Sequence, residues 1–176
     1  MITALLAAGA AASFTLTSPD LPKGKPIGNK HVFNSFGCSG DNVSPALEWK
    51  GAPKSAKSFA LTVYDPDAPT GSGWWHWVVY NLPAGTTKLD AGAGDAKGSG
   101  LPIGAAQGNT DFGAPGYGGP CPPPGKPHHY VFTVYALDTE KLDIPPNATA
   151  AFVGFNIHGH TVGKATFTAT YGRSKR

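Results

Sequence analysis

Short runs rich in Val, Phe, Tyr, Trp and Thr alternate along the chain with Gly and Pro, a pattern typical of strands joined by turns and long loops. Strands are predicted at residues 14–17, 46–49, 58–64, 74–81, 130–137 and 165–171. One segment, residues 148–158, has the pattern of a helix, with Asn147 expected as its N-cap. The chain is therefore predicted to be mainly β.

Residues two positions apart share one face of a strand, and this alternation sorts the polar groups of the predicted sheet. The apolar row of residues 59–63 continues into Asp65, so a carboxylate stands where a core residue is expected. In the next strand His76 has the parity of Val78 and Tyr80, and Trp75 has the opposite parity. Both faces of that strand are apolar, which predicts a central position in the sheet.

Asp65 ends one strand and His76 begins the next, so antiparallel pairing places both at one rim of the sheet. His128 and Tyr130 enter a third strand and are expected at the same rim. Taken singly, a strand histidine is more often a hydrogen-bonded core residue than a ligand contact. Four such groups at one end of an apolar sheet are costly to bury without partners, which favours a site.

Composition and charge limit the architecture and the partners. A chain of 176 residues, 40% of them hydrophobic, suffices for one core, so one domain is expected at residues 13–172. The formal charge is +3, but the two arginines, Arg173 and Arg176, both lie in the last four residues. This placement argues against nucleic-acid binding and is typical of a solvated basic tail, residues 173–176.

The N-terminal segment and the cysteines both bear on the compartment. Residues 2–12 are apolar and small, like the core and cleavage site of an export signal, although a first strand is the alternative and a basic leader is lacking. No stretch reaches transmembrane length. Cys38 and Cys121 lie in Gly-rich loops and would pair in an oxidising compartment, the alternative being two free thiols. A periplasmic or secreted location is expected, with a cytoplasmic one as the alternative.

Three parts of the sequence resemble the phosphatidylethanolamine-binding protein family, closest to its bacterial Raf-kinase-inhibitor-like branch. DPDAP at residues 65–69 with GWWHWVVYNLP at 73–83 is similar to the first family signature. GGPCPP at 118–123 with HHYVF at 128–132 is similar to the second, and DNVSPALEW at 41–49 adds a third match. The motifs are well separated and in order, which makes the resemblance specific.

The resemblance implies a β-sandwich with a large central sheet, a smaller second sheet, a C-terminal helix and a shallow cavity that accepts phosphate-like groups. Carried over position by position, the ligand-binding residues would be Asp65, Pro69, Trp74, His76, Gly119, Pro120, His128 and Tyr130. Family members commonly have Arg at the position of His129, but strand parity directs this side chain away from the pocket.

The expected function is binding of a small anion, such as a phosphate or a phospholipid head group, without a cofactor or metal. Protonatable imidazoles, a Tyr hydroxyl and loop N–H groups can donate hydrogen bonds to phosphate oxygens. Asp65 would hold a histidine in one tautomer or receive the amine of an ethanolamine group.

Two other function classes are open. The resemblance also implies a protein-interaction module that inhibits a protease or a kinase-type partner. A hydrolytic enzyme is the weaker alternative: Asp, His and Tyr are acid–base candidates, but no nucleophile elbow occurs and a paired Cys121 cannot attack. A metal site is disfavoured because His128 and His129 are adjacent rather than convergent.

Overall fold

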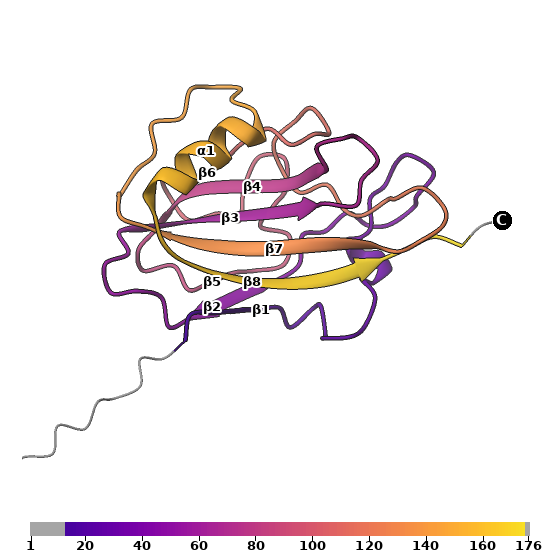
Figure 1. The fold of residues 1–176 in the computed structure, drawn as a ribbon, viewed down its shortest axis with the longest axis horizontal. Coiled ribbons are helices and arrows are strands. Elements are labelled where there is room, and N and C mark those ends of the chain that lie inside the picture. The colour runs from indigo at the N-terminus through magenta and orange to yellow at the C-terminus, as the bar shows by residue number, and fades with distance from the viewer. Residues whose placement is uncertain (1–12, 175–176) are drawn as a thin grey trace, which may run out of the picture.

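The computed structural model describes residues 13–174 as two antiparallel sheets and one helix (Figure 1). The larger sheet, in the order β6-β4-β3-β7-β8, contains β3 (Ser58–Asp65), β4 (Trp74–Pro83), β6 (Ala106–Gln107), β7 (His128–Leu137) and β8 (Thr161–Tyr171). The smaller sheet, in the order β1-β2-β5, contains β1 (Thr15–Thr17), β2 (Leu47–Lys50) and β5 (Lys88–Leu89). The predicted β-sandwich is confirmed, and the export signal expected at residues 2–12 lies outside the described residues.

Two apolar layers hold the larger sheet in the centre of the molecule. Between the sheets, Leu47 and Trp49 of β2 belong to one buried cluster with Leu61 of β3 and Phe132 of β7. On the opposite face, Val153 and other apolar residues of the helix pack on β3, β4 and β7. Burial on both faces explains why the central strands β3 and β4 are apolar almost throughout.

The helix α1 (Ala150–His160) begins two residues later than predicted. Thr149 is its N-cap, and its Oγ1 accepts a hydrogen bond of 3.2 Å from the backbone N–H of Phe152. The prediction that Asn147 caps the helix was wrong, because this residue has a φ of 63° and belongs to the preceding turn. A short 3-10 turn, η1 (Asn29–His31), is the other helical element of residues 13–174.

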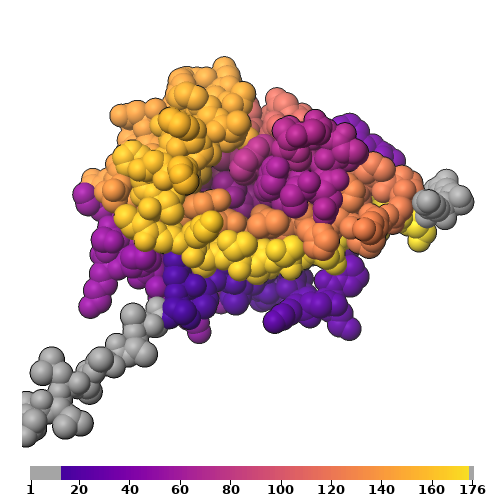
Figure 2. Space-filling view, viewed as in Figure 1, coloured from indigo at the N-terminus to yellow at the C-terminus, as the bar shows by residue number. Residues whose placement is uncertain are grey.

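The last strand, β8, follows α1 directly and forms one edge of the larger sheet. Figure 2 shows β8, in yellow, running across the viewed face below α1, with the indigo N-terminal segment beneath it. Between residues 13 and 174 no helix has the length and apolar character needed to cross a membrane.

Candidate functional site

A β-bulge in β4 determines where the side chain of His76 lies. In the ladder between β3 and β4, Val63 pairs with Trp77 and Tyr64 pairs with Trp75. His76 is therefore the extra residue that has no partner in β3. Bulges of this kind redirect a side chain and occur next to functional sites more often than elsewhere.

Because of the bulge, strict alternation gave the wrong face for this part of β4. The sequence placed His76 with Val78 and Tyr80, and it placed Trp75 on the other face. In the structure Val78 and Tyr80 pack on the helix side, and Trp75 packs there with them. The ring of His76 instead lies 5.1 Å from the ring of Tyr130, which belongs to the core between the sheets.

A cavity of about 180 Å³ opens where β3 ends and where β4 and β7 begin. Six of the eight residues predicted to bind a ligand line this cavity: Asp65, Pro69, Trp74, His76, His128 and Tyr130. The prediction that acidic, imidazole and phenolic side chains from three strands gather in one hollow is thus confirmed.

Gly119 and Pro120, which the resemblance placed in the pocket, do not line the cavity. The Gly119 N–H donates a hydrogen bond of 2.7 Å to Asn42 Oδ1, and the Gly118 N–H donates to a carbonyl of β4. A Cβ atom at Gly119 would lie 2.2 Å from the carbonyl oxygen of His31, so only glycine fits there. The loop N–H groups expected to donate to a phosphate are therefore occupied within the protein.

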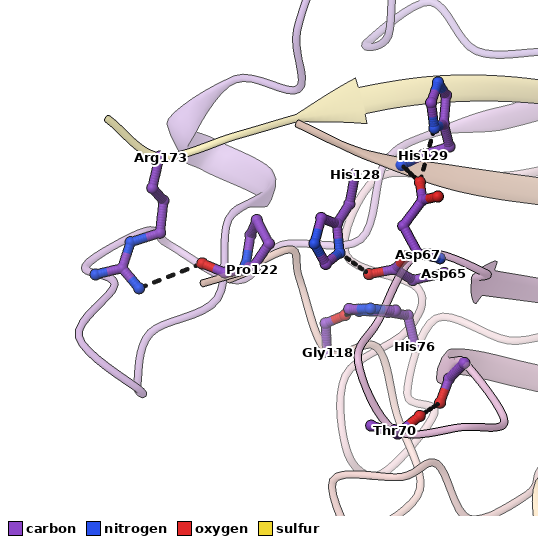
Figure 3. A network of polar contacts seen from close by, with 10 residues as sticks. Asp65, Asp67, Thr70, His76, Gly118, Pro122, His128, His129 and Arg173 are labelled. Carbon is purple, nitrogen blue, oxygen red and sulfur yellow. Dashed lines mark hydrogen bonds and ion pairs between the residues drawn. The ribbon is translucent and has the colours of Figure 1, made fainter. Parts of the chain in front are cut away.

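Asp65 and His128 form an ion-pair geometry at the cavity. His128 Nδ1 lies 2.7 Å from Asp65 Oδ2, and Asp65 Oδ1 accepts a hydrogen bond of 2.8 Å from the backbone N–H of Asp67 (Figure 3). A carboxylate only accepts hydrogen bonds, so His128 Nδ1 carries the hydrogen. Asp65 therefore holds His128 in one orientation and leaves Nε2 as its free polar atom.

His76 is buried and is held by a backbone carbonyl. Its Nδ1 donates a hydrogen bond of 2.6 Å to the carbonyl oxygen of Gly118 (Figure 3). Burial lowers the pKa of His76 to about 4, and this effect outweighs the Gly118 carbonyl and the charge of Asp65, which act in the opposite direction. The ring is therefore neutral at neutral pH and has a lone pair on Nε2. It cannot donate to a phosphate as the sequence suggested.

The hydroxyl of Tyr130 is the clearest unsatisfied group at the site. It is shielded from solvent and has no hydrogen-bond partner among the described residues. Burial raises the pKa of Tyr130, so the hydroxyl keeps its hydrogen and remains a donor. Buried donors without an acceptor are rare in native proteins and call for an explanation.

Aromatic side chains that the sequence analysis missed form a further wall of the cavity. Phe36 and Phe112 line it, with ring centroids 6.0 Å apart in a stacked arrangement. The ring of Phe112 also meets the edges of Trp74, at 5.4 Å, and of His76, at 5.3 Å. One feature of the sequence could have pointed to Phe36: it lies two residues before Cys38, which was expected to pair with Cys121 in the second motif.

A disulfide and an arginine hold the loop that carries Phe36 in place. The predicted bridge between Cys38 and Cys121 is present, with the sulfur atoms 2.06 Å apart. Arg173 donates to the carbonyl oxygen of Pro122 at 3.4 Å (Figure 3). It also donates to the carbonyl oxygen of Gly37 at 3.0 Å. The expectation that Arg173 belongs to a solvated tail was therefore wrong.

Two further predictions concern groups outside the cavity. His129 pairs with Asp67 at 2.7 Å, and it does not line the cavity, as strand parity predicted. This contact lowers the pKa of Asp67 through the hydrogen bonds from His129. Within residues 13–174, no three His, Cys, Asp or Glu side chains are grouped so that they could hold a metal ion.

Comparisons with known proteins match this geometry to one family. The family model described as "Phosphatidylethanolamine-binding protein" matches residues 14–172. The chain is 52% identical to the UPF0098 protein YbcL of Escherichia coli over 162 residues, 92% of this chain and 88% of YbcL. It is 51% identical to the UPF0098 protein YbhB of the same organism over 156 residues, 89% of this chain and 98% of YbhB.

Solved structures have the same fold. The crystal structure of Escherichia coli YbcL, described as a new member of the mammalian PEBP family, superposes with a TM-score of 0.89 at 51% identity. That match covers 92% of this chain and 99% of YbcL. A PEBP homologue from Chlamydia trachomatis has a TM-score of 0.75 at 34% identity, covering 92% of this chain and 99% of its own.

Proposed function

The chain belongs to the phosphatidylethanolamine-binding protein family, and we propose that it binds a small phosphate-bearing anion in the cavity between β3, β4 and β7. The observation that carries this proposal is the Tyr130 hydroxyl, a buried donor without a partner in the wall of that cavity. An anion oxygen is the acceptor that this donor lacks. The neighbouring His128, oriented by Asp65, offers Nε2 as a second contact.

The charges at the cavity support a weakly charged guest. Its wall contains one carboxylate, that of Asp65, and two imidazoles, those of His76 and His128. The carboxylate of Asp65 is engaged by His128, and burial keeps His76 neutral at neutral pH. Recognition therefore depends on placed hydrogen bonds more than on an excess of positive charge.

The substitution Tyr130→Phe tests the proposal because it removes one oxygen atom and keeps the ring. Isothermal titration calorimetry with phosphoethanolamine should show an affinity lower by at least about tenfold, the usual effect of losing a hydrogen bond to a charged group. Tyr135→Phe is the matched control, since Tyr135 lies on the same strand but packs on the helix side. Equal affinities of both variants and the parent protein would refute the assignment.

We propose a binding role rather than a catalytic one. Cys121 lines the cavity but is bonded to Cys38, and the Thr70 hydroxyl donates to the carbonyl of Gly73. Both side chains that resemble nucleophiles are therefore engaged. Release of phosphate from a panel of phosphomonoesters, abolished by His76→Phe, would establish catalysis instead.

Inhibition of a protease or a kinase-type partner is the second candidate function, and one feature of the cavity rim favours it. Phe36 is 64% exposed although it lines the cavity, so its ring is available to a partner surface. Affinity capture that recovers one stoichiometric protein with the parent chain, and not with Phe36→Ser, would support this role.

We also propose a periplasmic or secreted location. The support is the Cys38–Cys121 disulfide, since such bonds persist in oxidising compartments. Cell fractionation followed by thiol labelling without reductant tests the location directly. Two labelled cysteines and a cytoplasmic fraction would contradict it.

A further inference from the structure

The outer edge of β8 is only partly paired. β8 bonds to β7 along one side and ends the larger sheet on the other. On the outer side the N–H of Ile27 donates a hydrogen bond of 2.8 Å to the carbonyl oxygen of Thr170, and Pro26 forms an isolated bridge with Thr170. In an antiparallel pair, alternate residues direct their backbone groups to opposite sides. The N–H and C=O groups of Thr166 and Thr168 therefore point outward, like those of Thr170.

These outward groups of Thr166 and Thr168 are unpaired in the part of the chain that the structure describes. Neither residue takes part in a backbone hydrogen bond outside the strand ladders. The unbridged stretch, residues 164–169, begins after the irregularity at the start of β8 and ends before the bridge with Pro26. At roughly 3.3 Å per residue it is about 20 Å long. A free edge of this length is a template for pairing with another strand.

A groove of about 560 Å³ lies beside this edge, between residues 16–25 and residues 166–170. Both of its walls belong to the face seen in Figure 2, where β8 is yellow and the N-terminal segment is indigo. Leu16, Leu21 and Ala169, from the core between the sheets, give the groove an apolar surface. Successive side chains of a strand point to opposite faces, so a strand added to β8 can direct every second side chain onto this surface.

The charged side chains of the groove are all positive. Lys23 and Lys25 line it and are exposed, and its described lining contains no Asp or Glu. The lysines that form ion pairs within residues 13–174 are Lys30, Lys88 and Lys141. The ammonium groups of Lys23 and Lys25 are therefore available to a partner, and electrostatic complementarity favours an acidic one.

We propose that the outer edge of β8 and this groove bind an extended acidic peptide segment of another protein, which joins the larger sheet as an additional strand. Backbone hydrogen bonds to Thr166 and Thr168 set its register, apolar side chains fill the groove and carboxylates meet Lys23 and Lys25. A second copy of the chain fits less well, because pairing two β8 edges would bring two positive grooves together. The proposal does not depend on the anion site.

A fluorescein-labelled hexapeptide of alternating Glu and Val tests the proposal by fluorescence anisotropy with the intact protein. Two control peptides separate the contributions: one has Lys in place of Glu, and the other has a methyl group on every backbone nitrogen, which removes the donors needed for strand pairing. At low ionic strength the Glu–Val peptide should bind saturably and at least about tenfold more tightly than either control. Its affinity should fall as salt is added, because the charges are exposed.

Two variants test the protein side. Thr168→Pro removes an outward N–H without removing a bond to β7, and it should weaken binding of the Glu–Val peptide by at least about fivefold. The double substitution Lys23→Glu, Lys25→Glu should weaken it by on the order of tenfold. Lys97→Glu, Lys141→Glu makes the same change in net charge at exposed positions outside the groove and should keep the affinity within about twofold. If Thr168→Pro does not fold, the lysine variants and the methylated peptide decide the question.

Equal binding of the Glu–Val peptide and either control peptide would overturn the proposal, as would no binding of the Glu–Val peptide. Displacement of this peptide by saturating phosphoethanolamine would also overturn it, because the groove and the cavity share no lining residue. A dimer that sedimentation detects for the parent protein, and not for Thr168→Pro, would assign the edge to a second copy of the chain instead.

Discussion

The ligand-free protein should become more stable when the Tyr130 hydroxyl is removed and less stable when the Tyr117 hydroxyl is removed. Both tyrosines are buried, with exposed fractions of 1% and 6%. Tyr117 donates a hydrogen bond of 2.9 Å to the carbonyl oxygen of His31. Tyr130 Oη has no partner among the described residues. The two side chains thus differ in hydrogen bonding rather than in burial.

The expected free-energy changes follow from this difference. An unpaired buried polar group costs about 1 to 3 kcal/mol, so Tyr130→Phe should raise the free energy of unfolding by about 1 kcal/mol. Tyr117→Phe leaves the His31 carbonyl without its donor and should lower the free energy of unfolding by roughly 1 to 2 kcal/mol. In a domain of this size each kcal/mol shifts the melting temperature by about 2 to 4 °C.

Urea unfolding followed by tryptophan fluorescence, with phosphate-free buffer, measures both changes. Equal unfolding slopes are needed, so that a change in the midpoint reports stability. A loss of stability in Tyr130→Phe as large as that in Tyr117→Phe would refute the reasoning, because it would mean that the Tyr130 hydroxyl makes a favourable bond in the empty protein.

Three other perturbations have defined outcomes. Replacing Cys38 and Cys121 by serine opens a loop of 83 residues and should cost about 4.5 kcal/mol on the chain-entropy estimate, measured by urea unfolding with and without reductant. The pKa of His76 is lowered from 6.5 to about 4 in the folded protein, so as the pH falls this histidine takes up a proton in the unfolded chain before it does so in the folded protein. The stability due to this histidine is therefore complete above pH 6.5 and lost as the pH falls toward 4, by on the order of 3 kcal/mol, and His76→Gln should flatten that slope. His129→Ala, which removes the exposed pair with Asp67, should leave phosphoethanolamine affinity within about twofold.

Strand parity predicted most of the cavity because two of its three strands alternate regularly. Leu61, Val63 and Asp65 of β3 do share a face, and Tyr130 and Phe132 of β7 join the same core. The larger sheet was also predictable as a set of strands, since its long elements are rich in β-branched and aromatic residues. The short strands β5 (Lys88–Leu89) and β6 (Ala106–Gln107) were not predictable, because a segment of two residues shows no periodicity.

The position of His76 was not predictable from alternation, because a bulge is a property of the ladder between two strands. Nothing in the sequence around Trp75 and Trp77 shows that one residue lacks a partner in β3. Gly119 was misassigned for a related reason. Its backbone is close to His31, far away in sequence, and this packing accounts for the glycine without a ligand.

The hydrogen bonds around the cavity show which of its polar groups are engaged within the protein. Asp65 needs no ligand, since its oxygens accept from His128 and from the Asp67 N–H. The group at the cavity that is buried and left without a partner among the described residues is the Tyr130 hydroxyl, and His128 keeps Nε2 free because only its Nδ1 bonds Asp65. An anion oxygen is an acceptor, so it would supply the partner that the Tyr130 hydroxyl lacks. The same hydroxyl is thus expected to lower the stability of the protein without a ligand and is proposed to bind the guest, and this is why Tyr130→Phe should gain stability and lose affinity together.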